Sequence, residues 1–131
     1  MVLLDTQAWL WWLHDPKRLT KPARAAIEKS SRDDGLRVSA ISVWEIAVKV
    51  QIGKLTLPLP VETWFAQASQ YPHIAIEPLL PEDAIASTLL PGTFHKDPAD
   101  RIIIALARRL AVSVVTADVQ IRAYPHVRSV W

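Results

Sequence analysis

Cysteine is absent from this chain of 131 residues, and its absence excludes several kinds of chemistry together. The protein can form no disulfide, offers no thiolate to a metal and has no cysteine nucleophile, so any metal ion must be bound by oxygen or imidazole. Glycine is scarce as well, and three residues are too few to build a glycine-rich nucleotide-binding loop. Nucleotide-driven chemistry is therefore not expected.

Long apolar runs are also missing. No segment reaches the roughly 18 consecutive apolar residues of a membrane-spanning helix, and no basic leader precedes the apolar start of the chain. We therefore expect a cytoplasmic protein that is neither secreted nor inserted in a membrane. Half of the residues are apolar, which is enough for a substantial core, and no repeat or linker divides the chain. We expect a single domain over residues 1–131.

Apolar segments of two kinds alternate along the sequence. Short β-branched runs predict strands, and runs with apolar residues at helical spacing predict helices. We expect strands at about 1–4, 37–41, 73–78, 112–116 and 127–131, and helices at about 6–13, from 22 to a loop at 30–35, at 42–51, 61–70 and 81–89, and after Pro98. The last helix is nearly all apolar and should be central. This order predicts an α/β fold with a mainly parallel central sheet of four to five strands.

Four carboxylates stand where these elements begin or end: Asp5, Glu45, Asp100 and Asp118. Asp5 and Asp118 each follow an apolar strand, while Glu45 and Asp100 each lie in the first turn of an expected helix. Parallel strands bring such positions together at the carboxyl edge of the sheet, where open α/β sheets bind ligands. Carboxylates gathered there raise each other's pKa values by repulsion, a cost that a divalent cation removes. Oxygen ligands of this kind select Mg²⁺ or Mn²⁺.

Each acid also has a purely structural alternative. Ser42 and Glu45 have the spacing of a capping box, so Glu45 alone could serve the start of its helix. Asp97 suits the N-cap of the helix that begins at Pro98, which leaves Asp100 for the ion. The two strand-end aspartates could cap a helix or open a turn. One shared site nevertheless explains four converging acids better than four unrelated caps do.

Four blocks of the sequence resemble, in the same order, the PIN domain of VapC-type toxins. The first block is Leu3-Leu4-Asp5-Thr6, and the last is Val115-Thr116-Ala117-Asp118. Between them lie residues 38–47, which contain Ser-Val-Trp-Glu-Ile, and residues 95–105, which contain Asp-Pro-Ala-Asp-Arg. The two middle blocks together are rather specific, and the resemblance spans nearly the whole chain.

The resemblance implies a single PIN domain with a three-layer α/β/α sandwich. It further implies an endoribonuclease that depends on Mg²⁺, for which Mn²⁺ can substitute, and that hydrolyses a phosphodiester with a metal-activated water. Such a protein is the toxin of a toxin–antitoxin pair, so a cognate VapB-like antitoxin and a homodimer are the expected partners besides RNA.

Carried over by position, the acidic quartet is Asp5, Glu45, Asp100 and Asp118. The resemblance makes Asp5 and Asp100 the principal metal ligands. Asp118 would complete the site or a second metal position, and Glu45 would bind the ion directly or through water. Three further residues would support the site: Thr6 and Thr116 through their hydroxyl groups, and Asp97 as an additional acid.

Basic residues near the acidic blocks are candidates for RNA binding. The net charge of +2 is too small to indicate a nucleic-acid partner by itself, although a pI near 9.2 permits one. Lys49 lies near the end of its expected helix, while Lys96 and Arg101 flank Asp100. Basic groups around an acidic centre suit a phosphodiester substrate. Ordinary solubilising charge explains any one of these residues equally well.

Two other functions remain open at this point. The chain could be a PIN-type RNA-processing nuclease without an antitoxin, or a noncatalytic PIN-like binding module. The binding module would be expected to lose at least one acid, whereas all four are present. A phosphatase with an aspartyl nucleophile at Asp5 is disfavoured, because it usually needs a second acid two residues later, where Gln7 stands.

Aromatic residues and histidines give weaker indications. Trp9, Trp11 and Trp12 occupy one short helix and cannot all face one core, since neighbouring helical positions point about 100° apart. We expect at least one to be exposed and suited to a second subunit or an antitoxin. His95 precedes an acidic block and could contact a phosphate, whereas the other histidines lack a metal-ligand spacing.

Overall fold

The computed structural model describes every residue from Met1 to Trp131 and has one five-stranded sheet at its centre. The strands are β1 (Val2–Leu4), β2 (Leu36–Ser39), β3 (Ile74–Glu77), β4 (Ser113–Val115) and β5 (Ser129–Val130). Their order across the sheet is β3-β2-β1-β4-β5, and every neighbouring pair is parallel. The α/β fold with a parallel central sheet is therefore confirmed.

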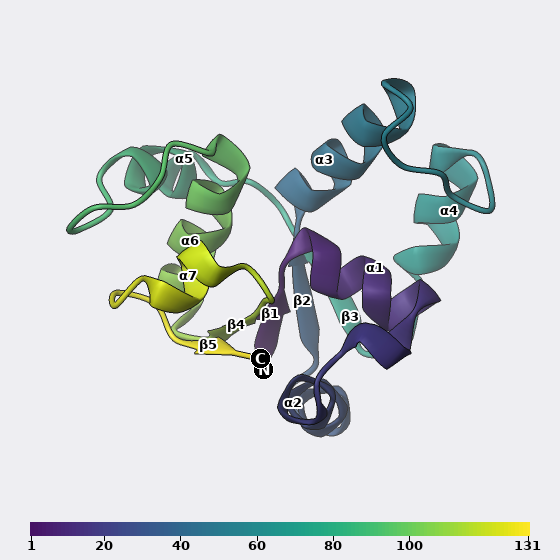
Figure 1. The fold of residues 1–131 in the computed structure, drawn as a ribbon, viewed down its shortest axis with the longest axis horizontal. Coiled ribbons are helices and arrows are strands. Elements are labelled where there is room, and N and C mark those ends of the chain that lie inside the picture. The colour runs from purple at the N-terminus through teal and green to yellow at the C-terminus, as the bar shows by residue number, and fades with distance from the viewer.

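Helices cover both faces of this sheet, as Figure 1 shows. They are α1 (Thr6–His14), α2 (Lys21–Arg32), α3 (Ala40–Gln51), α4 (Val61–Ala68), α5 (Pro81–Thr88), α6 (Pro98–Leu110) and α7 (Val119–Ala123), with a 3-10 turn η1 (Pro16–Arg18) after α1. The turn η1 and the short α7 were not expected from the sequence. None of these helices combines the length and the hydropathy that a membrane-spanning helix requires.

Side chains of β1 alternate between two cores, as the twofold repeat of a strand requires. Val2 and Leu4 pack with α1, α2 and α4 on one face, whereas Leu3 packs against α6 on the other. The second core includes Ile103 and Leu106, which are almost completely buried. This arrangement confirms the three-layer sandwich and the central position expected for α6.

Helix α3 begins two residues earlier than expected, and this overturns the capping-box interpretation of Glu45. Its N-cap is Ser39, whose hydroxyl accepts a hydrogen bond from the Ile41 amide at 3.2 Å. Both Ser39 and Ser42 are suitable caps, and the choice between them depends on where β2 stops pairing with β3, which is at Ser39. Glu45 therefore lies in the second turn of α3, where its carboxylate has no capping role.

The tryptophans of α1 are less exposed than expected. Trp9 is fully buried, while Trp11 and Trp12 are half-buried. The ring of Trp11 lies 5.7 Å from that of Trp131, and the ring of Trp12 lies 5.2 Å from that of Tyr71. The expectation of an exposed tryptophan in this helix is wrong, because residues distant in sequence cover both rings. The exposed tryptophan is Trp44 on α3, with 59% of its surface accessible.

Candidate metal centre

Asp5 is the most enclosed acid of the candidate centre. It follows the last residue of β1 and caps α1, since its Oδ1 accepts a hydrogen bond from the Ala8 amide at 2.8 Å. Its other oxygen, Oδ2, accepts a hydrogen bond from the hydroxyl of Thr116, at the end of β4. Burial raises the pKa of Asp5 to about 6, although both hydrogen bonds oppose that rise. The capping role and the site role therefore coexist in one side chain.

Glu45 is held in place by hydroxyl groups from two helices. The Thr6 hydroxyl lies 2.6 Å from Oε1 of Glu45 and 2.8 Å from Oγ of Ser42. A hydroxyl has one proton and a carboxylate accepts only, so Thr6 donates to Glu45 and Ser42 donates to Thr6. The expected contact of Thr6 with the acidic site is present. The buried Ser42 extends it, a part that sequence analysis missed because that residue was read as a helix cap.

Asp100 lies at the start of α6 beside the acid that caps this helix. Asp97 accepts a hydrogen bond from the Asp100 amide at 3.0 Å, as expected for the N-cap. Burial raises the pKa of Asp100 to about 7, and repulsion from Asp97, Asp118, Glu45 and Asp5 contributes in that order. The capping arrangement thus leaves the Asp100 side chain free to point into the acidic centre.

Asp118 completes the acidic group at the end of the segment that follows β4. Its Oδ1 accepts a hydrogen bond from the Gln120 amide at 2.8 Å, so Asp118 caps α7 as well. Single ligand atoms of Asp118, Asp100 and His95 lie within 4.8 Å of one another, close enough to share one metal ion. Asp5 is not part of this closest group.

His95 is the residue that the structure adds most clearly to the site. Its Nε2 lies 3.1 Å from Oδ2 of Asp100, yet Nε2 is buried and makes no well-aligned hydrogen bond. A sequence signal existed, since His95 stands five positions before Asp100, but that spacing spans a loop and a helix start. Only the tertiary structure brings the imidazole to the acids.

The acidic side chains line one cavity of about 380 Å³. The cavity is bordered by Asp5, Thr6, Gln7, Glu45, Lys49, Asp97, Asp100, Ala117 and Asp118. Five carboxylates thus face a single lysine in a partly enclosed space. Burial is the largest cause of the two raised pKa values, and repulsion between the acids adds to it, so a bound cation would offset the cost of holding these negative charges in the cavity. The donor set, rich in oxygen with one imidazole nearby, fits a hard divalent ion.

The three basic residues named as RNA contacts have different surroundings. Lys49 is exposed and borders the acidic cavity, whereas the exposed Lys96 does not border it. The Arg101 guanidinium donates hydrogen bonds to the carbonyl oxygens of Ser87 and His95 at 2.9 Å and of Phe94 at 3.0 Å. Arg101 therefore fastens the loop that carries His95 against α5 and α6.

Known proteins resemble this chain over almost its full length. The family model described as PIN domain matches residues 2–127. Ribonuclease VapC22 of Mycobacterium tuberculosis (strain ATCC 25618 / H37Rv) is 36% identical over 129 residues, which are 98% of this chain and 95% of the relative. Both matches include all four segments that supply the acidic quartet.

Solved structures share the fold at low sequence identity. VapBC2 from Rickettsia felis, bound to a DNA fragment from its promoter, has a TM-score of 0.70 at 12% identity and covers 98% of this chain and 97% of that chain. A toxin–antitoxin complex from Klebsiella pneumoniae has a TM-score of 0.62 at 19% identity, with 97% and 95% covered. The family model over residues 2–127 and the relative at 36% identity together establish that this chain belongs to the PIN domain family.

Proposed function

We propose that this protein is a Mg²⁺-dependent endoribonuclease and the toxin of a toxin–antitoxin pair, with Mn²⁺ able to replace Mg²⁺. The observation that carries this proposal is the convergence of four acids from four separate segments in one cavity, two of them with raised pKa values. The name of the relative that is 36% identical, Ribonuclease VapC22, supports RNA as the substrate. When bound, the ion supplies charge neutralisation and a water of lowered pKa.

The residues would divide the work according to their surroundings. Asp5 and Asp100 would hold the ion, and Asp118 would complete its coordination or a second position. Thr116 fixes one oxygen of Asp5 by a hydrogen bond. A buried carboxylate fixed in this way keeps one geometry, which favours binding of an ion in a single arrangement.

Glu45 would hold the attacking water in place or bind the ion directly. Its carboxylate keeps one oxygen bonded to Thr6, which leaves the other for a water or an ion. Asp97 is mainly the cap of α6, and its charge adds to the negative field of the cavity. Lys49 and Lys96 would contact the RNA backbone, whereas Arg101 would act mainly by holding the loop of His95.

A VapB-like antitoxin and a second copy of the chain are the proposed protein partners. The structural neighbours from Rickettsia felis and Klebsiella pneumoniae are toxin–antitoxin assemblies by their descriptions, which supports this assignment. Expression of the protein alone should slow growth, and co-expression of the small protein encoded beside it should relieve the effect. Harmless expression of a nuclease that is active in vitro would instead favour an RNA-processing enzyme without an antitoxin.

The decisive experiment is incubation of the purified protein with total RNA, followed by mapping of the new ends. We expect cleavage with Mg²⁺ or Mn²⁺ and none with EDTA, because only a divalent cation compensates the charges of the cavity. Cleavage that persists in EDTA would contradict the metal-dependent mechanism. Retention of RNA without cleavage under any metal would favour a noncatalytic binding module.

A further inference from the structure

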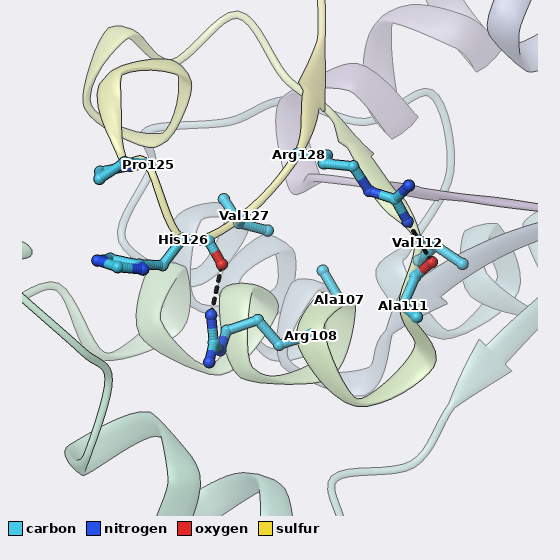
Figure 2. A pocket seen from close by; sticks show the side chains of 8 residues that line it. All are labelled: Ala107, Arg108, Ala111, Val112, Pro125, His126, Val127 and Arg128. Carbon is cyan, nitrogen blue, oxygen red and sulfur yellow. Dashed lines mark hydrogen bonds between the residues drawn. The ribbon is translucent and has the colours of Figure 1, made fainter.

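A second hollow, of about 410 Å³, lies at the opposite end of α6 from the acids (Figure 2). Its lining consists of Ala107, Arg108, Ala111, Val112, Pro125, His126, Val127 and Arg128. Two arginines and a histidine are the ionisable groups, and no carboxylate takes part. This hollow, the basic pocket, is therefore chemically suited to an anion.

Both arginines of the basic pocket are anchored without being neutralised. Arg108 donates from Nη1 to the carbonyl oxygen of His126, and Arg128 donates from Nη2 to that of Ala111, each at 2.5 Å. Figure 2 shows the two side chains reaching the pocket from different segments. Neither forms an ion pair, in contrast to Arg37 and Arg109, which bind carboxylates. A guanidinium has five N–H donors, so each retains a fixed fork for a phosphate or a carboxylate.

Helix capping explains only part of this arrangement. Arg128 satisfies the carbonyl of Ala111, which ends α6 in a left-handed conformation with φ of 56°. Arg108 instead binds a carbonyl 18 residues away, in the loop after α7, and stays exposed. Capping thus requires one arginine, whereas the pocket contains two.

A hollow without carboxylates adjoins the basic pocket, and His95 at its border contacts Asp100 of the acidic cavity. A line of neighbouring rings continues from His95 to Phe94 at 4.2 Å, from Phe94 to Tyr124 at 5.0 Å and from Tyr124 to His126 at 5.4 Å. This third hollow, of about 380 Å³, is bordered by Thr93, Phe94, His95, Gln120, Ala123, Tyr124 and Pro125, with the rings of Phe94 and Tyr124 themselves buried. It shares Pro125 with the basic pocket.

The length of this path fits a few nucleotides. Asp100 and Arg108 are eight residues apart on one helix, which corresponds to roughly 12 Å along its axis. Uncharged surface accepts nucleobases, whereas guanidinium groups accept phosphates. The order of surfaces along α6 and α7 is therefore an acidic site, an uncharged hollow and a basic pocket.

We propose that the basic pocket binds a phosphate of the RNA strand whose scissile bond lies at the acidic cavity, and that the hollow between them takes the intervening nucleotides. This proposal rests on the ribonuclease function proposed above. Arg108 and Arg128 bind the RNA at a distance from the scissile bond. They therefore determine the affinity for RNA and the number of phosphates bound, and they do not take part in the cleavage step.

The test measures binding of a fluorescent single-stranded RNA, by anisotropy over a range of salt, in an Asp100→Asn background that does not cleave. Removing both arginines in Arg108→Gln/Arg128→Gln should weaken binding several-fold and lower the slope of log K against log salt by about 0.7 for each lost phosphate contact. The matched control is Arg24→Gln/Arg32→Gln on α2, which removes two exposed arginines, one of them likewise anchored to a carbonyl. The control should leave the slope unchanged.

A second variant guards against an effect on folding. His126→Glu places a negative charge at the rim of the basic pocket while the backbone carbonyl that anchors Arg108 remains. It should also weaken RNA binding with a melting temperature close to that of the parent protein. Equal slopes for the parent, the arginine variant and His126→Glu would overturn the proposal, and cleavage by the wild-type protein would then still support the ribonuclease function.

Inorganic phosphate separates RNA from a free anion as the ligand. Phosphate should compete with RNA for the parent protein and lose this effect in Arg108→Gln/Arg128→Gln. Binding of phosphate to the pocket with an unchanged RNA slope would overturn the assignment to RNA and favour a free phosphate compound. Preference for an acidic peptide over RNA at equal charge would overturn it in favour of a protein partner.

Discussion

The two hollows at the ends of α6 are similar in size and opposite in chemistry. The acidic cavity, of about 380 Å³, gathers five carboxylates of which all but Asp97 are partly or wholly buried, whereas the basic pocket, of about 410 Å³, carries exposed arginines. The helix itself favours this polarity, because its N-terminal end attracts negative charge and its C-terminal end attracts positive charge. Burial decides the difference in cost: it is the largest cause of the raised pKa of Asp100, with repulsion from the neighbouring acids second, whereas solvent screens the charges of the pocket.

This contrast predicts that a substitution at the acidic end has the larger effect on activity. Asp100→Asn should lower RNA cleavage by at least about 10²–10³-fold, because it removes a charge that would hold the ion. The fold should survive, since a side chain with a pKa raised to about 7 already spends part of its time uncharged at neutral pH. Single-turnover cleavage and circular dichroism check both points.

The matched control for this substitution is Asp33→Asn. Asp33 is an exposed aspartate just after α2 and makes no side-chain contact in the structure with the acidic cavity. Asp33→Asn should cleave RNA as well as the parent protein. If Asp100→Asn does so too, the acidic cavity is not the site of cleavage.

The burial of these carboxyl groups predicts an unusual dependence of stability on pH. The pKa values of Asp5 and Asp100 rise from 3.8 to about 6 and about 7 on folding, so the folded protein binds more protons than the unfolded chain between these values. The metal-free protein should therefore lose stability as the pH increases through that window, by on the order of 2 kcal/mol after allowance for solvent around Asp100. Urea unfolding at about pH 5 and about pH 8 measures the loss.

A divalent cation should reverse this trend. It binds the ionised carboxylates, so the gain in melting temperature on adding Mg²⁺ or Mn²⁺ should be larger at about pH 8 than at about pH 5. Asp100→Asn should flatten the metal-free profile and reduce the gain. A metal-free protein that becomes more stable with rising pH over the whole window would contradict the crowding of the cavity.

A smaller loss of activity is expected when an uncharged residue that holds an acid in place is replaced. Thr116→Val keeps the shape of a fully buried side chain but removes its hydrogen bond to Asp5. It should cost about 1–3 kcal/mol of stability, because a buried acceptor loses its partner, and about 10-fold in activity. Thr63→Val on the exposed face of α4 is the control and should stay within about 0.5 kcal/mol. Equal unfolding curves for both variants would show that Thr116 does not hold Asp5.

The acids at strand ends could be predicted from the sequence because two local signals place them. A β-branched run marks the end of each strand, and parallel strands share a carboxyl edge, so Asp5 and Asp118 had to approach one another. The start of α3 could not be predicted in the same way. Both Ser39 and Ser42 are good caps, and pairing between β2 and β3 selects the first.

Contacts that depend on the folded shape of loops and helix ends could not be predicted from the sequence. The position of His95 before an acidic block suggested a phosphate contact but not that its ring meets Asp100, because that contact depends on hydrogen bonds from Arg101 to the carbonyl oxygens of Phe94 and His95. The basic pocket depends on Ala111, whose backbone has a left-handed conformation. Alanine rarely adopts this conformation, and no turn motif in the sequence predicts it. The acidic residues could be predicted from their positions at strand and helix ends. The residues that hold them in place, or that lie beside them, could be identified only from the folded structure.

The smallest predicted effect concerns Lys49, the one basic residue at the edge of the acidic cavity. Its ammonium is exposed, so it should assist the approach of RNA without taking part in the chemistry. Lys49→Gln should raise KM roughly three-fold and leave kcat nearly unchanged, and the difference should fade at high salt as the charge is screened. Lys54→Gln, just beyond the same helix and away from the cavity, is the control. A fall in kcat for Lys49→Gln with constant KM would make Lys49 part of the acidic centre. The separation between acids that take part in the reaction and basic residues that only bind RNA would then not hold for this residue.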